Sequence, residues 1–114
     1  MLSDEAIETR LNELREKAAE YATAYAEKEY LEEFKKTKLA LLMKDAEKSG
    51  CTSAAAQERE ARASKEYSDF LDGLKAATEK AERLRWQLRI AEIGADVWRS
   101  QEATKRAERK GYGA

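Results

Sequence analysis

The second half of the chain carries one apolar row with steps of three and four residues over more than four heptads. The row consists of Tyr67, Phe70, Leu74, Ala77, Ala81, Leu84, Leu88, Ala91, Ala95 and Trp98. Such steps return to the same side of an α-helix, and their long repetition is typical of a coiled-coil seam. The chain also contains no proline that would break a helix. The row therefore predicts a long helix that packs against a partner helix.

The first half shows the same spacing, with a visible start and end. Ser3 is a good N-cap, and Asp4 and Glu5 place negative charge in the first turn. The apolar row runs through Ile7, Leu11, Leu14, Ala18, Tyr21 and Tyr25. Its register breaks at Lys28, and Gly50 can supply a left-handed C-cap. We expect a helix over residues 4–48.

The stretch "SGCTSAAAQEREARAS" (49–64) decides how the two helices connect. Either Thr52 or Ser53 can cap a new helix, because "AAAQEREARA" has high helix propensity. We expect a bend at 49–53, a second helix over about 54–108, and a frayed tail at 109–114. The alternative is a break at Ser64, which would make 54–63 a separate short helix. So short a connection predicts one all-α domain, 1–114, folded as an antiparallel helical hairpin.

A second apolar row appears on the last helix, at Trp86, Ile90, Ile93 and Val97. Leu88 and Ile90 differ by about 200° around a helix, so this part of the helix is apolar on two opposite faces. A lone two-helix hairpin has one seam and buries little surface. We therefore predict a homo-oligomer, at least a dimeric four-helix bundle. Its predicted interface consists of Trp86, Ile90, Ile93, Val97 and Trp98.

An aromatic ladder lies on the first helix, at Tyr21, Tyr25, Tyr30 and Phe34. Its spacing predicts core packing at a wide seam. The alternative is a docking groove for a helix of another protein.

The residue content speaks against catalysis and against metal or cofactor binding. The chain has no histidine, and its single cysteine, Cys51, has no obvious activating base nearby in sequence. Glycine-rich phosphate loops are absent, and di-metal bundle sites need a histidine that this chain lacks. We expect a protein that is not an enzyme, with no catalytic residues, no metal site and no cofactor.

Charge is unevenly distributed although the net charge is −1. Residues 1–33 hold ten acids and four bases, whereas residues 83–114 hold four acids and eight bases. One interpretation is that this opposition favours antiparallel pairing. The other is that the basic segments bind the phosphates of single-stranded nucleic acid, with aromatic side chains stacking on bases. The candidate nucleic-acid-binding residues are Lys35, Lys36, Lys38, Arg83, Arg85, Arg89, Arg99, Lys105 and Arg106.

Hydrophobicity, the N-terminal sequence and the cysteine content indicate the cellular compartment. No apolar run approaches the length of about 20 residues that a membrane span needs, and "MLSDEAIETR" is acidic rather than a signal peptide. One cysteine cannot form an internal disulfide. We expect a cytoplasmic protein without a membrane partner.

The stretches "YLEEFKKTKLALLMKDAEKSG" and "AAAQEREARASKEYSDFLDGLKAATEKAERLRWQLRIAEIGADVWRSQEATKRAE" carry a family resemblance over residues 30–108. The chain resembles small all-helical proteins of tailed bacteriophages, which are encoded near genes for strand annealing and recombination. More remotely, its layout is similar to the recombination mediator of T-even phages. That resemblance implies a helical oligomer that binds single-stranded DNA and helps to load a recombinase, in the host cytoplasm.

Two functions follow as expectations. The first is a non-enzymatic, oligomeric accessory protein of phage DNA recombination or replication. It would contact single-stranded DNA or a recombination protein through the basic segments. The alternative is a helical protein–protein adaptor or inhibitor that makes no contact with nucleic acid.

Overall fold

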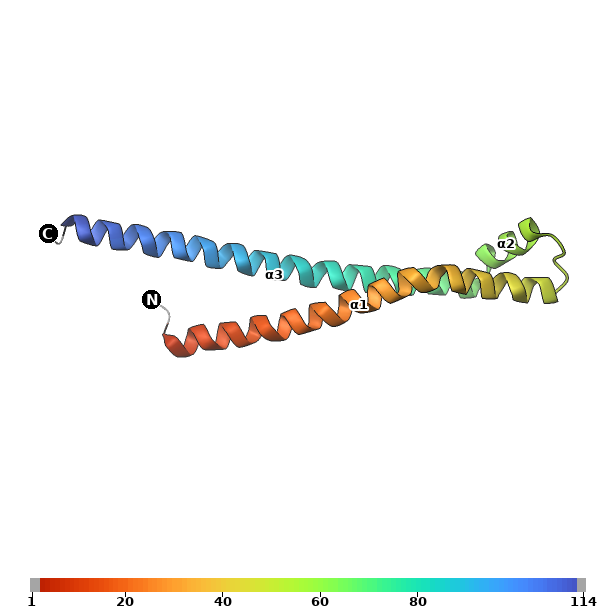
Figure 1. Cartoon of the computed structure of the whole chain (residues 1–114), viewed down its shortest axis with the longest axis horizontal. Coiled ribbons are helices and arrows are strands. Elements are labelled where there is room, and N and C mark those ends of the chain that lie inside the picture. The colour runs from red at the N-terminus through yellow and green to blue at the C-terminus, as the bar shows by residue number, and fades with distance from the viewer. Residues whose placement is uncertain (1–2, 113–114) are drawn as a thin grey trace. The chain divides into compact units, whose positions relative to one another are not determined.

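The chain folds into three helices over residues 3–112, which are the residues that the structure, a computed structural model, describes. They are α1 (Asp4–Lys48), α2 (Ala54–Ala63) and α3 (Lys65–Tyr112), and no strand is present in this range. In chain order the short helix α2 comes between the two long helices, and Figure 1 shows it next to the end of α1. The prediction of an all-α helical hairpin is confirmed.

The helix ends follow from local hydrogen bonds. Ser3 Oγ accepts a bond from the amide of Ala6 at 3.1 Å, as expected of an N-cap. At the end of α1, Gly50 has a φ of 109°, and the amide of Cys51 donates to the carbonyl of Ala46 at 3.0 Å. Together with the bond from Gly50 to Glu47, this forms a Schellman motif, which terminates the helix.

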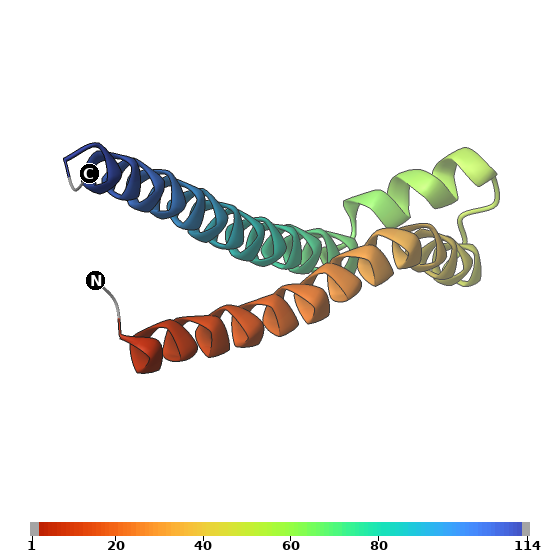
Figure 2. The same cartoon turned by 60° about the vertical axis from the view of Figure 1, so that its left-hand side comes forward.

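The chain breaks at Ser64, as the alternative reading of the sequence proposed. Ser53 rather than Thr52 caps α2, because its Oγ accepts from the amide of Ala56. Ser64 is extended, with φ −68° and ψ 149°, and its Oγ accepts from the amide of Tyr67 to cap α3. Figure 2 shows the loop at 49–53 and the turn between α2 and α3. The expected frayed tail is helical as far as Tyr112, and positions 113 and 114 lie outside the described residues.

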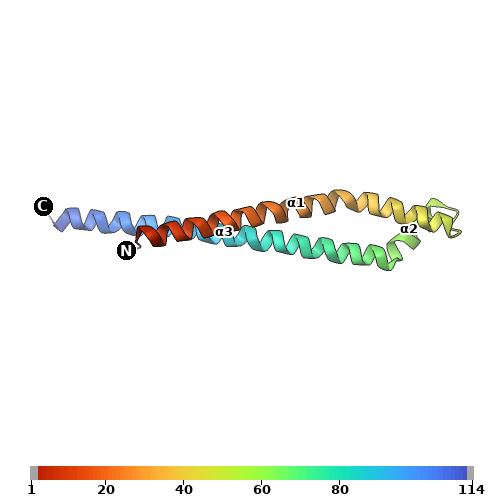
Figure 3. The same cartoon turned by 90° about the horizontal axis from the view of Figure 1, so that it is seen from below.

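The chain packs as two compact units. The first, which we call the hairpin unit, is Tyr21–Glu82. It contains the second part of α1, all of α2 and the start of α3, and α1 and α3 run there in opposite directions (Figures 1 and 3). The second, which we call the open unit, is made of Ser3, residues 4–20 of α1 and residues 83–112 of α3.

The hairpin unit holds a small hydrophobic core. Leu42, Ala61 and Tyr67 bring together one residue from each helix, and Leu39 and Met43 pack against them. The rings of Phe34 on α1 and Phe70 on α3 pack against each other, with 6.1 Å between the ring centroids. The core explains why the chain turns at Ser64, since a separate α2 can place Ala61 directly against α1.

The aromatic ladder departs from its expected core position. Tyr21 packs edge-on against Tyr25, and Tyr30 stacks on Phe34. The ring centroids of each pair are about 6 Å apart. Tyr25 and Tyr30 are nevertheless exposed. The prediction of core packing is therefore wrong for Tyr25 and Tyr30, whereas Tyr21 and Phe34 are half-buried.

Candidate functional site

The open unit leaves most of its apolar side chains in contact with solvent. Among its described residues, Leu84 is the buried one, whereas the hairpin unit buries six. The two helix segments of the open unit enclose a groove of about 750 Å³ instead of a closed seam. A groove of this kind marks a candidate binding surface, because monomeric proteins rarely expose large contiguous apolar patches.

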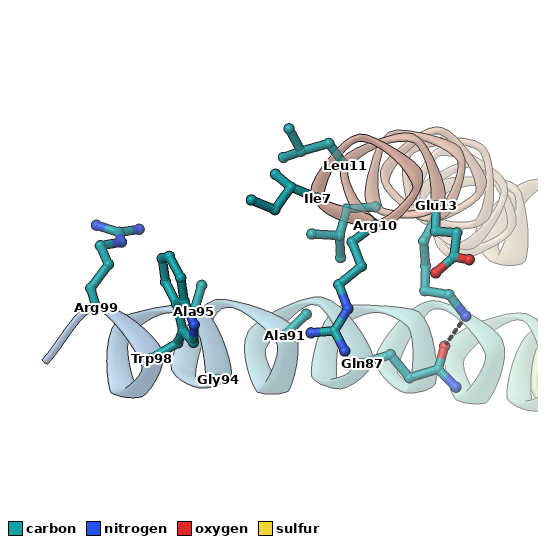
Figure 4. A pocket seen from close by; sticks show the side chains of 12 residues that line it. Ile7, Arg10, Leu11, Glu13, Gln87, Ala91, Gly94, Ala95, Trp98 and Arg99 are labelled. Atoms are coloured by element: carbon teal, nitrogen blue, oxygen red, sulfur yellow. Dashed lines mark hydrogen bonds between the residues drawn. The ribbon is translucent and has the colours of Figure 1, made fainter. Parts of the chain in front are cut away.

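The groove has an apolar floor and a polar rim. Its apolar lining comes from Ile7, Leu11 and Leu14 on α1 and from Ala91, Ala95 and Trp98 on α3. Figure 4 shows Ile7 and Leu11 on one side and the Trp98 ring standing on the other. The small residues Ala91 and Gly94 give the α3 wall a low profile. The groove could therefore accommodate the apolar side chains of another helix.

Charged side chains at the rim come from both helices. They are Arg10, Glu13, Lys17 and Arg99. Lys17 Nζ donates a hydrogen bond to Gln87 Oε1 at 3.0 Å, which links α1 and α3; Figure 4 draws it as the dashed line at Gln87. Arg99 pairs with Asp96 on its own helix at 3.6 Å.

A second apolar surface lies beside the groove on α3. It consists of Trp86, Ile90, Ile93 and Val97, and we call it the stripe. These side chains are between 47% and 65% exposed. Trp98, the fifth residue of the predicted interface, points into the groove instead. The stripe residues recur at steps of four and three, so they form one row along the helix.

The structure divides the nine candidate nucleic-acid-binding residues between the two units. Lys35, Lys36 and Lys38 lie on α1 in the hairpin unit, and the other six lie on α3 in the open unit. At about 100° per residue, four arginines fall on one side of α3. They are Arg85, Arg89, Arg99 and Arg106. Arg83 and Lys105 lie on the other side of the helix.

Several of these bases are paired with acids one turn away. Arg89 contacts Glu92 at 3.1 Å, and Lys105 contacts Glu102 at 3.7 Å. Arg85 places its guanidinium 5.6 Å from the centre of the Trp86 ring. The arginine row is thus interrupted by Glu92 and Asp96, which lowers its positive potential.

Sequence reasoning missed part of the site. It assigned Ile7 and Leu11 to a covered helix seam, and it gave no role to Arg10, Lys17 or Gln87. Ile7 and Leu11 could have been found, because they belong to the first apolar row. Nothing in the spacing marks Gln87, whose role depends on the crossing of the two helices.

The described residues show neither a metal cluster nor a spanning helix. Within 3–112, no three or more histidine, cysteine or acidic side chains gather in a way that could hold a metal ion. Over the same range, no helix combines the length and apolar character needed to cross a bilayer.

A comparison with protein-family models, with curated proteins and with solved structures finds no match for this chain. The resemblance to phage recombination proteins therefore stays a prediction.

Proposed function

We propose that this chain is a non-enzymatic helical adaptor that acts by self-association through the open unit. The observation that carries the proposal is the stripe, a row of four large apolar side chains that are each about half exposed. Covering such a row removes apolar area from water, which is the main driving force of protein association.

A charge placed in the stripe tests this proposal. Ile93 is about half exposed within a single chain, so Ile93→Glu removes little packing inside the chain but puts a carboxylate into the proposed interface. We expect size-exclusion chromatography with light scattering to give a dimer or larger for the wild type and a monomer for Ile93→Glu. Ala103→Glu, on an exposed α3 position outside the stripe, is the matched control and should leave the mass unchanged. A monomeric wild type would contradict the proposal.

A second candidate function is that of an oligomeric accessory protein of phage DNA recombination that contacts single-stranded DNA. The specific observation in its favour is the pairing of Arg85 with the half-exposed Trp86 ring. A guanidinium beside an exposed aromatic ring offers a phosphate contact and a stacking surface together. Assembly would repeat this pair on each copy, and several weak contacts along one strand would act together.

Charge reversal separates the two candidates. The double variant Arg85→Glu with Arg89→Glu is compared with Lys75→Glu with Lys80→Glu, which reverses two exposed bases in the hairpin unit. Fluorescence anisotropy with a labelled single strand is measured over a salt series. DNA binding through α3 predicts that the first variant loses about 1.4 from the slope of log K against log salt, for two phosphates at about 0.7 each. Equal losses in both variants, or no binding by the wild type at low salt, would favour the adaptor.

A further inference from the structure

The stripe and the groove are neighbouring faces of the same helix. Each stripe residue is followed immediately by a residue that lines the groove: Trp86 by Gln87, Ile90 by Ala91, Ile93 by Gly94 and Val97 by Trp98. Consecutive residues of an α-helix are about 100° apart. In the open unit, α3 therefore has two apolar faces, and the stripe lies about 100° from the groove-lining residues that follow it and further from Leu88, on the opposite side of the helix from Ile90. α1 covers one of them, and the other is uncovered among the described residues.

The facing helix also has an uncovered edge. Ile7 and Leu11 line the groove, yet they are 36% and 46% exposed, whereas Leu14 beside them is half-buried. Both lie on the α1 side of the groove mouth in Figure 4. Each helix of the open unit thus meets one neighbour and keeps apolar surface for a second. A helix of a four-helix bundle likewise packs against two neighbouring helices.

The charges of the two helix segments indicate which segment of a second copy would cover the stripe. Residues 4–20 carry six acidic and three basic side chains, and residues 83–112 carry four acidic and eight basic ones. If the stripes of two copies paired with each other, two basic segments would lie side by side, and Ile7 and Leu11 would stay uncovered. If the acidic segment of one copy covered the stripe of the other, every acidic segment would have two basic neighbours.

We infer that the second occupant of the open unit is another copy of this chain, bound so that residues 4–20 of each copy cover the stripe of the other. This inference rests on the proposed self-association and specifies its geometry. The four segments alternate acidic and basic around the bundle, and the same contact occurs twice across a two-fold axis. The two grooves face each other and close into a common core that contains Ile7, Leu11 and Trp98 of both copies.

Single-cysteine cross-linking tests this arrangement in the full chain. Cys51 is the only cysteine, so Cys51→Ser gives a background without thiols. One set of copies carries Leu11→Cys, and a second set, with a size tag, carries cysteine at position 86, 90, 93 or 97. Mixed pairs are oxidised mildly, and the products are separated by mass. A disulfide forms between residues whose Cα atoms approach within about 7 Å, so it reports adjacency. Light scattering is run on each sample before oxidation.

We expect mixed disulfides between position 11 and the stripe to exceed both same-position disulfides. The stripe position that reacts best then reports the direction of the partner segment. Glu92→Cys is the matched control, because position 92 lies about 200° from Ile90 on an exposed side of α3. It should react little with position 11.

The outcomes separate this inference from the proposal on which it rests. A dimer in which stripe positions cross-link mainly to each other overturns the inference and leaves self-association standing. Reaction of position 92 as strong as that of position 90 also overturns it. If light scattering shows a monomer, both the inferred arrangement and the proposed self-association are wrong.

Discussion

At the scale of single residues, two adjacent leucines of α1 differ in burial and should therefore differ in their contribution to stability. Leu41 and Leu42 are consecutive on α1, but Leu42 is buried against Ala61 and Tyr67 while Leu41 is exposed. We expect Leu42→Ala to lower the free energy of unfolding by about 2–3 kcal/mol, through lost burial and the cavity left behind. Leu41→Ala should change it by less than about 0.5 kcal/mol. Urea unfolding of both variants provides the measurement, and equal effects would place the core elsewhere.

The effect of backbone conformation on stability can be tested by substituting Gly50, with Gly73 as the control. At Gly50 a Cβ would meet no neighbouring atom within 4 Å, so the cost of a side chain there comes from its φ of 109° alone. Gly50→Ala should destabilise the protein by about 1–2 kcal/mol.

Gly73 provides the control for that substitution. It lies within α3, and a Cβ there also meets open space. Gly73→Ala should therefore stabilise the protein by about 0.5–1 kcal/mol, because alanine is the better helix former. Thermal unfolding followed by circular dichroism measures both variants, and a shift of the same sign in the two would contradict the assignment of the C-cap.

At the scale of elements, α2 depends on a cap that sequence alone left between two residues. Ser53 Oγ accepts from the amide of Ala56, whereas Thr52 lies outside the helix without this bond. Ser53→Ala should cost about 1 kcal/mol of stability, the usual value for a lost N-cap. Thr52→Ala, the adjacent control, should cost less than about 0.5 kcal/mol. Chemical denaturation distinguishes them, and a larger loss at Thr52 would move the cap by one residue.

At the scale of the whole molecule, self-association predicts that stability depends on protein concentration. A partner that binds the folded chain alone stabilises it by mass action. We expect the Tm of the wild type to rise over a hundredfold range of protein concentration. Tryptophan fluorescence suits the measurement, since Trp86 and Trp98 lie on the stripe and in the groove.

The matching expectation for Ile93→Glu is a Tm that does not change with concentration, because this variant should no longer associate. A concentration-dependent Tm in that variant would show that association uses another surface. A constant Tm in the wild type would count against self-association altogether.

Much of the fold could be predicted from residues whose effects are local. The apolar rows, Ser3 and Gly50 predicted α1 over the residues that it occupies, and Ser64 was recognised as a point where the chain could start a new helix. The candidate site was predicted less well. The stripe was found because its four residues share one helix, but Trp98 belongs to the groove. The aromatic ladder was assigned to the core, and Tyr30 is exposed.

What the sequence determined by itself is helicity, helix ends and the faces of each helix, since these depend on propensity, caps and spacing within a few residues. Only the tertiary structure decided which of those faces are covered. In the hairpin unit, the turn at Ser64 brings Ala61 against Leu42 and closes a core. In the open unit, the same kind of apolar row remains half exposed beside a groove. Coverage depends on where a second helix lies in space, and residue spacing within one helix carries no information about that position.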